Sequence, residues 1–259
     1  MRKIINRPNL LILLSMLLTT GVAWADSNSI SKQFTTDFNL AACTFSVTGG
    51  NVYFSLDPAL GPMNPILLEG EEDKELVQVE ISVLPLEMDV DLSSLGLGIV
   101  ETRVIEEMEW IDGELVEVST NFFARCEETG DVYYFGEDVV IYEDGDTITG
   151  AEAGAWLAGE LAEDGETFNL PGIIMPGTFL LGARYYQEVA PEVALDRAEN
   201  IDMGLTVETP ADTYDYCVKI DETTPLEPSA KDTKVYAYGH GIIIDAAIER
   251  VNVFTPDPR

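Results

Sequence analysis

The chain has 259 residues, of which 47 are acidic, 14 are basic and one is a histidine, so its formal net charge at pH 7 is −33. A charge of this sign and size repels phosphate, which excludes nucleic acid as a partner and argues against anionic membrane surfaces. One histidine is too few for a histidine-rich zinc or copper site, and the length suits one large β domain or two small ones.

Residues 1–25 are predicted to be a secretory signal peptide. Three basic residues precede an apolar core at residues 10–18, and the Ala-Trp-Ala sequence at 23–25 fits a cleavage site. The apolar core is too short to span a bilayer, and no later stretch is long and apolar enough for a transmembrane helix. We therefore expect an exported protein, periplasmic or extracellular, whose 234 mature residues include 11 basic and 47 acidic ones.

The mature chain is predicted to begin with a flexible lead-in over residues 26–45, followed by a single domain over 46–253 and a tail over 254–259. At 77–83 apolar residues alternate with polar ones, which predicts a strand. Residues 86–99 fit either a short helical turn or an irregular loop.

Residues 101–150 predict a run of antiparallel strands joined by tight turns. From Thr102 to Trp110 the even positions are mostly apolar and the odd ones mostly charged, a period of two that is typical of a half-buried strand. Asp112-Gly113 fits a two-residue hairpin turn, and the alternation resumes over 116–125. Strands at 132–135 and 139–142 are predicted on either side of a turn at Gly136-Glu137-Asp138, and Asp144-Gly145 predicts another turn.

The composition changes at residues 151–168, which are rich in Ala, Gly and Glu around Trp156 and Leu157. A short helix or loop that acts as a mobile lid is predicted there. Strands are expected again between 183 and 245, the last two forming a hairpin around Gly239-His240-Gly241. With no sustained helix, repeat or linker, we expect a mainly β protein with a large curved antiparallel sheet, either an open half-barrel or a sandwich.

Three cysteines remain in the mature chain: Cys43, Cys126 and Cys217. In an oxidising compartment we expect one disulfide and one free thiol, and the sequence leaves all three pairings open. The wide spacings exclude a zinc ribbon and a CxxC redox motif.

Five stretches together resemble an uncharacterised family of secreted bacterial hypothetical proteins with WYA, VWYFGED, PGIIMP and ETTPLEPG motifs. They stand in the order expected for that family: Asn121–Ala124, Val132–Asp138, Pro171–Pro176, Tyr185–Glu188 and Thr223–Pro228. The resemblance covers roughly residues 50 to 246, and it implies a shared fold without an activity. The segment Tyr236–Ile243 is also similar to the last hairpin of periplasmic half-barrels of the lipoprotein-carrier type, a likeness of fold alone.

His240 is the histidine that any Ser-His-Asp or Cys-His mechanism would require, because the chain has no other imidazole. It lies between two glycines, which is typical of a surface turn, and no GxSxG motif accompanies it. Carboxylates are so numerous that a pair of them says nothing about hydrolysis. We therefore expect a protein that is not an enzyme.

Two functions are predicted. The first is a binding protein that holds a small apolar or lipid-like ligand on its curved sheet. Its candidate ligand contacts are Trp156, Tyr186, Glu188 and Arg197, although a cross-strand Arg–Glu pair is the simplest explanation of the charges in this region.

The alternative is an acidic periplasmic or extracellular structural or surface protein that binds calcium or a protein partner. Asp144 and Asp146 are the candidate calcium ligands, in a turn that lacks the EF-hand pattern. A solvated acidic surface, suited to salty surroundings, is the simplest explanation of the charge, and no cofactor other than calcium is considered.

Overall fold

The computed structural model describes residues 33–148, 154–162 and 164–252, and these residues form one large antiparallel sheet. The predicted signal peptide, the tail over 254–259 and part of the predicted lid lie outside the described residues. The sheet runs in the order β10-β12-β13-β14-β15-β16-β2-β3-β4-β5-β6-β9-β11, with β1 on β5 and both β7 and β8 on β6. The strands are β1 Phe45–Ser46, β2 Ile66–Glu72, β3 Glu75–Asp91, β4 Ile99–Ile111, β5 Glu114–Cys126, β6 Val132–Glu143, β7 Asp146–Thr147, β8 Trp156–Leu157, β9 Leu170–Met175, β10 Arg184–Tyr186, β11 Glu188–Val189, β12 Arg197–Glu208, β13 Thr213–Thr223, β14 Asp232–Ala237, β15 Gly241–Asp245 and β16 Ile248–Arg250.

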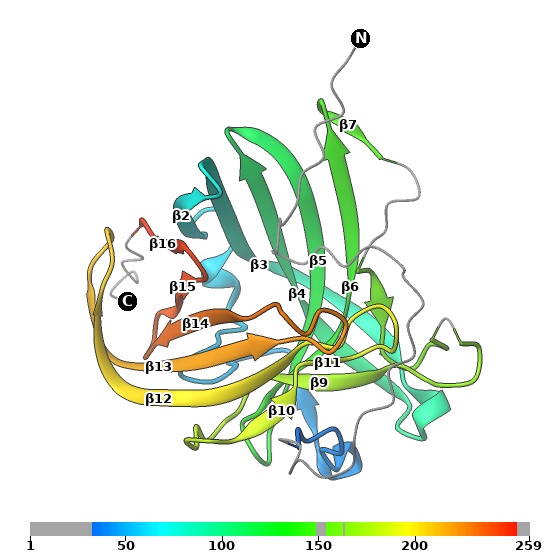
Figure 1. Cartoon of the computed structure of the whole chain (residues 1–259). Helices are drawn as coiled ribbons and strands as arrows, with labels where there is room; N and C mark the ends of the chain where they lie inside the picture. The colour runs from blue at the N-terminus through cyan, green and yellow to red at the C-terminus, as the bar shows by residue number, and fades with distance from the viewer. Residues whose placement is uncertain (1–32, 149–153, 163, 253–259) are drawn as a thin grey trace.

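The two ends of this sheet meet, so that it forms a nearly closed barrel (Figure 1). Strands β10 and β11 follow one another with Gln187 between them; Tyr185 of β10 pairs with Ala198 of β12, and Glu188 of β11 pairs with Pro171 of β9. In Figure 1 the strands β3 to β6 run up the picture, and β12 to β14 cross in front of them. The prediction of a mainly β protein with a large curved antiparallel sheet is confirmed.

The hairpin turn predicted at Asp112-Gly113 is confirmed. Asp112 has φ 51° and Gly113 has φ 83°, the left-handed values that a two-residue hairpin turn requires, and Ile111 pairs with Glu114 across it. The predicted turn at Asp144-Gly145 has the same geometry and joins β6 to β7.

The turn predicted at residues 136–138 is wrong, because β6 runs through it without a break. Gly136 has φ 134°, and the register with β5 shifts beside it, so this glycine forms a bulge rather than a turn. A Cβ atom on Gly136 would lie 2.2 Å from the Trp156 carbonyl oxygen, which explains why this position has no side chain. Glu137 consequently lies inside a central strand.

In the ambiguous stretch at 86–99, β3 continues to Asp91 and the 3₁₀ helix η3, Ser93–Leu95, follows.

One hydrophobic core cluster includes residues of β2 to β6, β9, β13 and β14, and side chains of the segment before β2 pack against it. Within the predicted lead-in, the 3₁₀ helix η1, Leu40–Ala42, precedes β1, and the rings of Phe38 and Phe45 pack edge-on against Tyr133 of β6. A further 3₁₀ helix, η2, spans Pro58–Leu60. Cys43 and Cys126 form a disulfide that links the predicted lead-in to β5. Cys217 is a buried free thiol.

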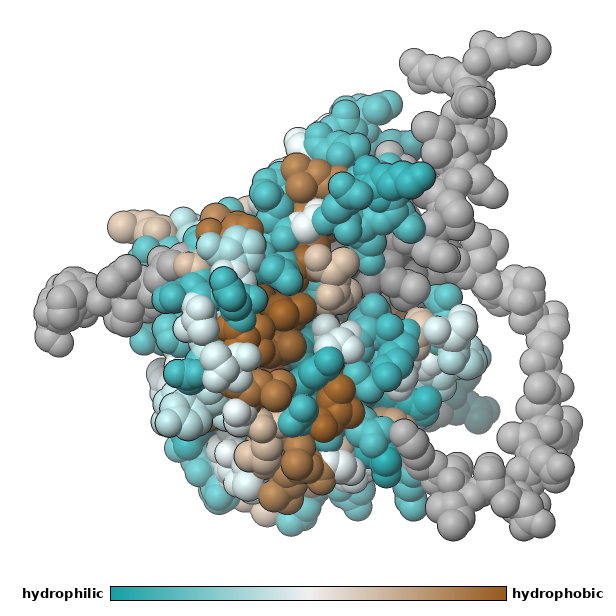
Figure 2. All heavy atoms as spheres, turned by 60° about the vertical axis from the view of Figure 1, so that its left-hand side comes forward, coloured by the Kyte–Doolittle hydropathy of each residue, from teal (hydrophilic) through white to brown (hydrophobic). Residues whose placement is uncertain are grey.

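A second, smaller apolar cluster lies on the other face of β13 to β15, where it contains Cys217, Tyr214 and Ile243. Figure 2 shows a band of apolar residues on one side of the molecule, flanked by hydrophilic ones, so the exterior is not uniformly acidic. In the part of the chain that the structure describes, no helix has the length and apolar character needed to cross a membrane.

Candidate functional site: an acidic belt inside the barrel

Near the hairpin that joins them, β4 and β5 bury their acidic side, although the sequence pattern made the even, apolar side of β4 the better candidate for burial. Glu109 and Glu117 are direct cross-strand partners, and only 3% and 8% of their surfaces are exposed. Met108 and Val118, on the opposite side of the same strands, are half-buried. The barrel therefore encloses carboxylates beside the β4–β5 hairpin, while the outer side of these strands carries apolar residues there.

Carboxylates from successive strands continue around the interior. They influence one another's pKa values across the barrel: that of Glu107 responds to Lys234, Asp245 and Glu222 on the facing strands. We call the eight carboxylates of this ring the acidic belt. Its members are Glu107, Glu109, Glu117, Glu137, Glu188, Asp196, Glu222 and Asp245.

Lys234 is the basic side chain that forms ion pairs with the acidic belt in the described part of the chain. Its ammonium lies 3.0 Å from Glu222 Oε2 and 3.4 Å from Asp245 Oδ2. Burial by itself lowers the pKa of Lys234, but the charges of Asp245 and Glu222 outweigh burial and raise that pKa well above its ordinary value.

The belt is reachable by solvent on the side of Lys234. The side chains of Lys234, Asp245 and Glu222 keep 23%, 16% and 13% of their surface exposed. Burial nevertheless acts strongly on both Lys234 and Asp245: it opposes the rise in the pKa of Lys234 and is the main cause of the rise in that of Asp245. These groups are surrounded by protein and still touch solvent, so solvent meets the belt at this place.

Glu109, Glu117 and Glu137 are largely protonated at neutral pH, and Glu107 is protonated in part. Burial, followed by the neighbouring carboxylates, raises the pKa of Glu109 and of Glu117 to about 8. Burial also raises the pKa of Glu137 to about 8, and the nearby Tyr134 hydroxyl offsets part of that shift. Burial raises the pKa of Glu107 to about 7 despite the opposing charge of Lys234, and it raises that of Glu188 well above the ordinary range. At neutral pH the belt is therefore ionised only in part, and a further cation beside it would favour the ionised form.

Several buried oxygens of the belt lack a hydrogen-bond donor among the described residues. They are both carboxylate oxygens of Glu137, Oε2 of Glu188 and Oε1 of Glu109. The Tyr134 hydroxyl lies beside Glu137 but donates its proton to Asn121 Oδ1.

Gln187 repeats this feature with a neutral side chain. Its Nε2 donates to Glu222 Oε1 at 2.7 Å, which places the amide at the belt. Its Oε1 has no donor among the described residues, although only 2% of the residue is exposed. Buried acceptors without donors are costly, so the interior is suited to a group that brings N–H donors and positive charge.

Aromatic rings stand next to the deep end of the belt. Tyr134 stacks on Phe123 with ring centroids 4.6 Å apart, and Trp156 meets Tyr134 edge-on at 5.5 Å. In register, Trp156 of β8 is the partner of Glu137. This part of the interior therefore combines carboxylates with an apolar aromatic wall.

Two of the four predicted ligand contacts lie at the belt. Trp156 and Glu188 are buried there, whereas Tyr186 and Arg197 pair with each other across β10 and β12 and contact Phe34. The Arg197 guanidinium lies 4.5 Å from the Phe34 ring centroid and donates to the Thr223 hydroxyl.

A cross-strand Arg–Glu pair is present in this region, between Arg184 and Glu199 at 2.6 Å. It joins β10 to β12 one register step from Tyr185 and Ala198. This pair explains the charges of Arg184 and Glu199, whereas Glu188 belongs to the acidic belt.

The predicted calcium ligands are exposed at the β6–β7 hairpin. Asp144 borders a recess of about 320 Å³ that is also lined by Glu114, Leu115, Tyr142 and Gly145. Asp146 pairs with Glu143 across the turn.

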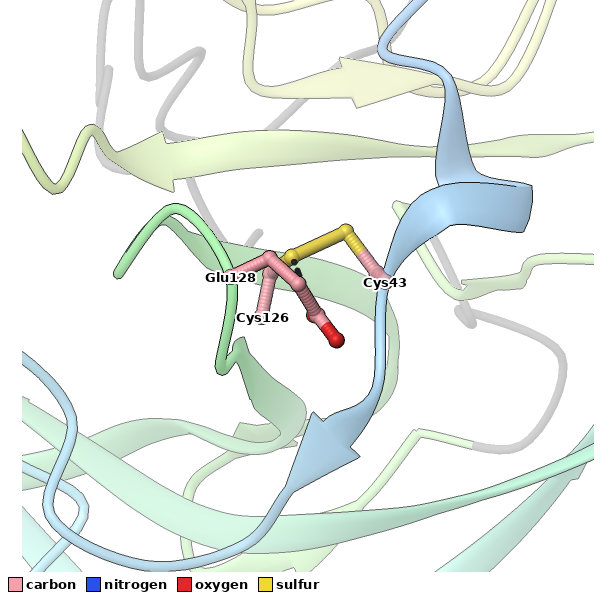
Figure 3. A group of neighbouring side chains, drawn as sticks. All are labelled: Cys43, Cys126 and Glu128. Carbon is pink, nitrogen blue, oxygen red and sulfur yellow. Dashed lines mark hydrogen bonds between the residues drawn. A yellow bond between two sulfur atoms is a disulfide. The ribbon is translucent and has the colours of Figure 1, made fainter.

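Among the described residues, one group of three potential metal ligands has its ligand atoms close together: Cys43, Cys126 and Glu128 (Figure 3). The two sulfurs are joined in the disulfide, and the Glu128 carboxylate accepts hydrogen bonds from the Thr44 backbone and hydroxyl. These bonds lower the pKa of Glu128 and explain its position without a metal. A second recess, of about 650 Å³, adjoins this place but includes no belt residue.

No protein-family model, curated protein or solved structure matches this chain. The chemistry of the acidic belt is therefore the ground on which a function is proposed.

Proposed function

We propose that this chain is an exported, non-enzymatic binding protein that holds a small organic cation inside its barrel. The observation that carries the proposal is the acidic belt, in which eight carboxylates face one ammonium and buried acceptor oxygens lack donors. A ligand with an ammonium group supplies the positive charge and the N–H donors together.

The belt changes the class of ligand that the sequence predicts. A purely apolar ligand would desolvate the carboxyl groups without replacing their hydrogen bonds, which costs free energy. An ammonium attached to an apolar body pairs with Glu137 or Glu188 and places its carbon atoms against Trp156 and Tyr134.

A bare calcium ion fits this interior less well. Calcium takes six to eight oxygen ligands at short distances. In the described residues, no three belt carboxylates bring their oxygens as close together as such a site requires. An organic cation distributes its contacts over a longer distance.

Export is supported by two independent features. The first 25 residues have the pattern of a signal peptide, and the Cys43–Cys126 disulfide is typical of an oxidising compartment. A ligand in the periplasm or outside the cell can reach such a protein without entering the cytoplasm.

The test is a thermal-shift and calorimetric titration of the mature protein at pH 7.5. The probes are 2-phenylethylamine, 1,4-diaminobutane, dodecanoate and calcium chloride, each compared with sodium chloride at equal ionic strength. An amine should raise the melting temperature saturably, because it binds the folded state. The proposal fails if no amine exceeds sodium chloride; a response to dodecanoate alone would restore the lipid-like ligand.

Two variants locate the binding. Glu137→Gln removes a belt carboxyl group that a bound ammonium would ionise, and it should weaken amine binding at least tenfold. Asp138→Asn removes a carboxyl group from the next residue of β6, which is exposed on the outer side, and should leave binding unchanged. Equal losses in both variants would mean that the amine binds the acidic surface and not the interior.

A further inference from the structure

We infer that the ligand is a linear polyamine, with at least two ammonium groups that bind separate carboxylates of the acidic belt. The inference rests on the proposed function and adds the number and arrangement of the positive charges. It is carried by the count of unpaired carboxylates, their positions on the strands and the orphaned amide oxygen of Gln187.

Lys234 shows how many carboxylates one ammonium occupies in this interior. It contacts two, Glu222 and Asp245, at 3.0 and 3.4 Å. The other six belt carboxylates form no ion pair among the described residues: Glu107, Glu109, Glu117, Glu137, Glu188 and Asp196. At two carboxyl groups for each ammonium, a singly charged ligand leaves most of these six groups without a cationic partner.

The strand geometry sets the distance between these carboxylates. Glu109 and Glu117 are direct cross-strand partners, so their Cβ atoms are separated by about 5 Å. Glu107 lies two residues earlier on the same face of β4, about 7 Å away along the strand. Chains of three or four methylene groups separate the nitrogens of common polyamines by comparable lengths. A linear polyamine therefore matches neighbouring carboxylates along the belt.

The deep end of the belt offers a second place for an ammonium. Glu137 and Glu188 affect each other's ionisation, and each has an oxygen without a donor. Gln187, next in sequence to Glu188, has its Oε1 without a donor as well. A protonated amine here would donate hydrogen bonds to the amide oxygen of Gln187 and to the carboxylates of Glu137 and Glu188.

The walls between these places suit methylene groups. The Trp156 and Tyr134 rings lie beside Glu137, and ammonium groups are also attracted to the faces of such rings. Solvent reaches the belt beside Lys234, which gives a flexible linear molecule a route inward. Lys234 itself fixes the positive charge at that end, so the ligand's own ammonium groups are expected farther inside.

The proton balance follows from the same contacts. Glu109, Glu117 and Glu137 are largely protonated at pH 7.5, with pKa values of about 8. An ammonium beside a carboxyl group favours its ionised form, and the released proton passes to the buffer. A ligand with more ammonium groups should release more protons.

The experiment compares butylamine, 1,4-diaminobutane and spermidine by calorimetry at pH 7.5, each in phosphate and in Tris, two buffers with different ionisation enthalpies. Affinity should rise at least tenfold from butylamine to 1,4-diaminobutane. The difference between the buffers should show more protons released by the diamine than by the monoamine. Glu117→Gln and Glu137→Gln should each reduce this advantage of the diamine, and Asp138→Asn should preserve it.

The outcomes separate the two proposals. If butylamine binds as tightly as 1,4-diaminobutane and releases as many protons, the site takes one ammonium: the polyamine is refuted and the organic-cation proposal stands. If none of the three amines binds, both proposals fall. If Glu117→Gln weakens the diamine and Glu137→Gln does not, the ligand does not extend to the deep end, and the arrangement inferred here is wrong.

Discussion

Raising the pH from 6.5 to 8.5 should destabilise the folded protein. Glu109, Glu117 and Glu137 have folded-state pKa values of about 8, chiefly because they are buried. In the unfolded chain a glutamate has a pKa of about 4.3. The folded state therefore binds protons that the unfolded state has already lost, and stability declines as the pH rises toward the folded-state pKa.

The magnitude follows from linkage. Each carboxyl group that is protonated only in the folded state contributes a slope of about 1.4 kcal/mol per pH unit. Three such groups together contribute about 4 kcal/mol per unit near pH 6.5, and Glu188 and Glu107, whose pKa values burial also raises, act in the same direction. Because the carboxyl groups interact and titrate together, we expect a slope of about 1–4 kcal/mol per unit that levels off above pH 8.

Two other titrating groups near the interior, His240 and Lys234, do not produce this trend. Burial lowers the pKa of His240, so its contribution is lost as the pH falls through about 6.5 and has the opposite sign. The pKa of Lys234 is raised, and its contribution is lost only in strongly alkaline solution. Burial also raises the pKa values of Asp196 and Asp245, to about 6, and these two groups add to the decline at the acidic edge of the range.

The assay is urea unfolding at pH 6.5, 7.5 and 8.5, followed by circular dichroism. Glu137→Gln should reduce the slope by about one carboxyl group, and Asp138→Asn should not change it, because Asp138 is exposed. A wild-type stability that is constant or rises between pH 6.5 and 8.5 would refute the burial of these groups in the belt.

Three further predictions concern the frame around the belt. Gly113→Val should lower the free energy of unfolding by roughly 1–3 kcal/mol, because Gly113 has φ 83°, which a β-branched residue adopts only with backbone strain. A Cβ atom at this position would meet no other atom within 4 Å, so no steric clash adds to the strain. An unchanged urea midpoint would contradict this prediction. Cys126→Ser should cost about 3–5 kcal/mol, since the disulfide links positions 83 residues apart, and Cys217→Ser is the comparison that keeps it; equal midpoints for the two variants would argue against the pairing. Millimolar calcium should raise the melting temperature no more than sodium chloride of equal ionic strength, because Asp144 is an exposed turn residue, and a larger calcium shift would indicate a site.

Local features of the sequence predicted local structure well. The alternation over 77–83 and 101–125, and the Asp-Gly pair at 112–113, specify strands and a hairpin turn through short-range sterics and side-chain pattern. The turn predicted at Gly136 was wrong because glycine also suits a bulge. Whether Gly136 forms a bulge or a turn is decided by its neighbours in space, Trp156 on β8 and Phe122 on β5.

The carboxylates of the belt were harder to predict than the strands that carry them. Glu107 and Glu109 share one side of β4, and the alternation shows that much. Glu117 of β5 lies on the same side only because the register shifts between Glu109 and Trp110, which the alternation does not show. The alternation cannot say which side faces inward, because both sides of these strands are partly covered and an acidic side is ordinarily the solvated one.

By itself, then, the sequence determined the β character, the hairpins and the residues that share each strand face. Only the tertiary structure decided that the acidic face lies inside. Residues 184–189 pair with β9 on one side and with β12 on the other, and this closes the sheet around the carboxylates. That closure depends on contacts between strands far apart in the chain, so no periodicity within one strand encodes it.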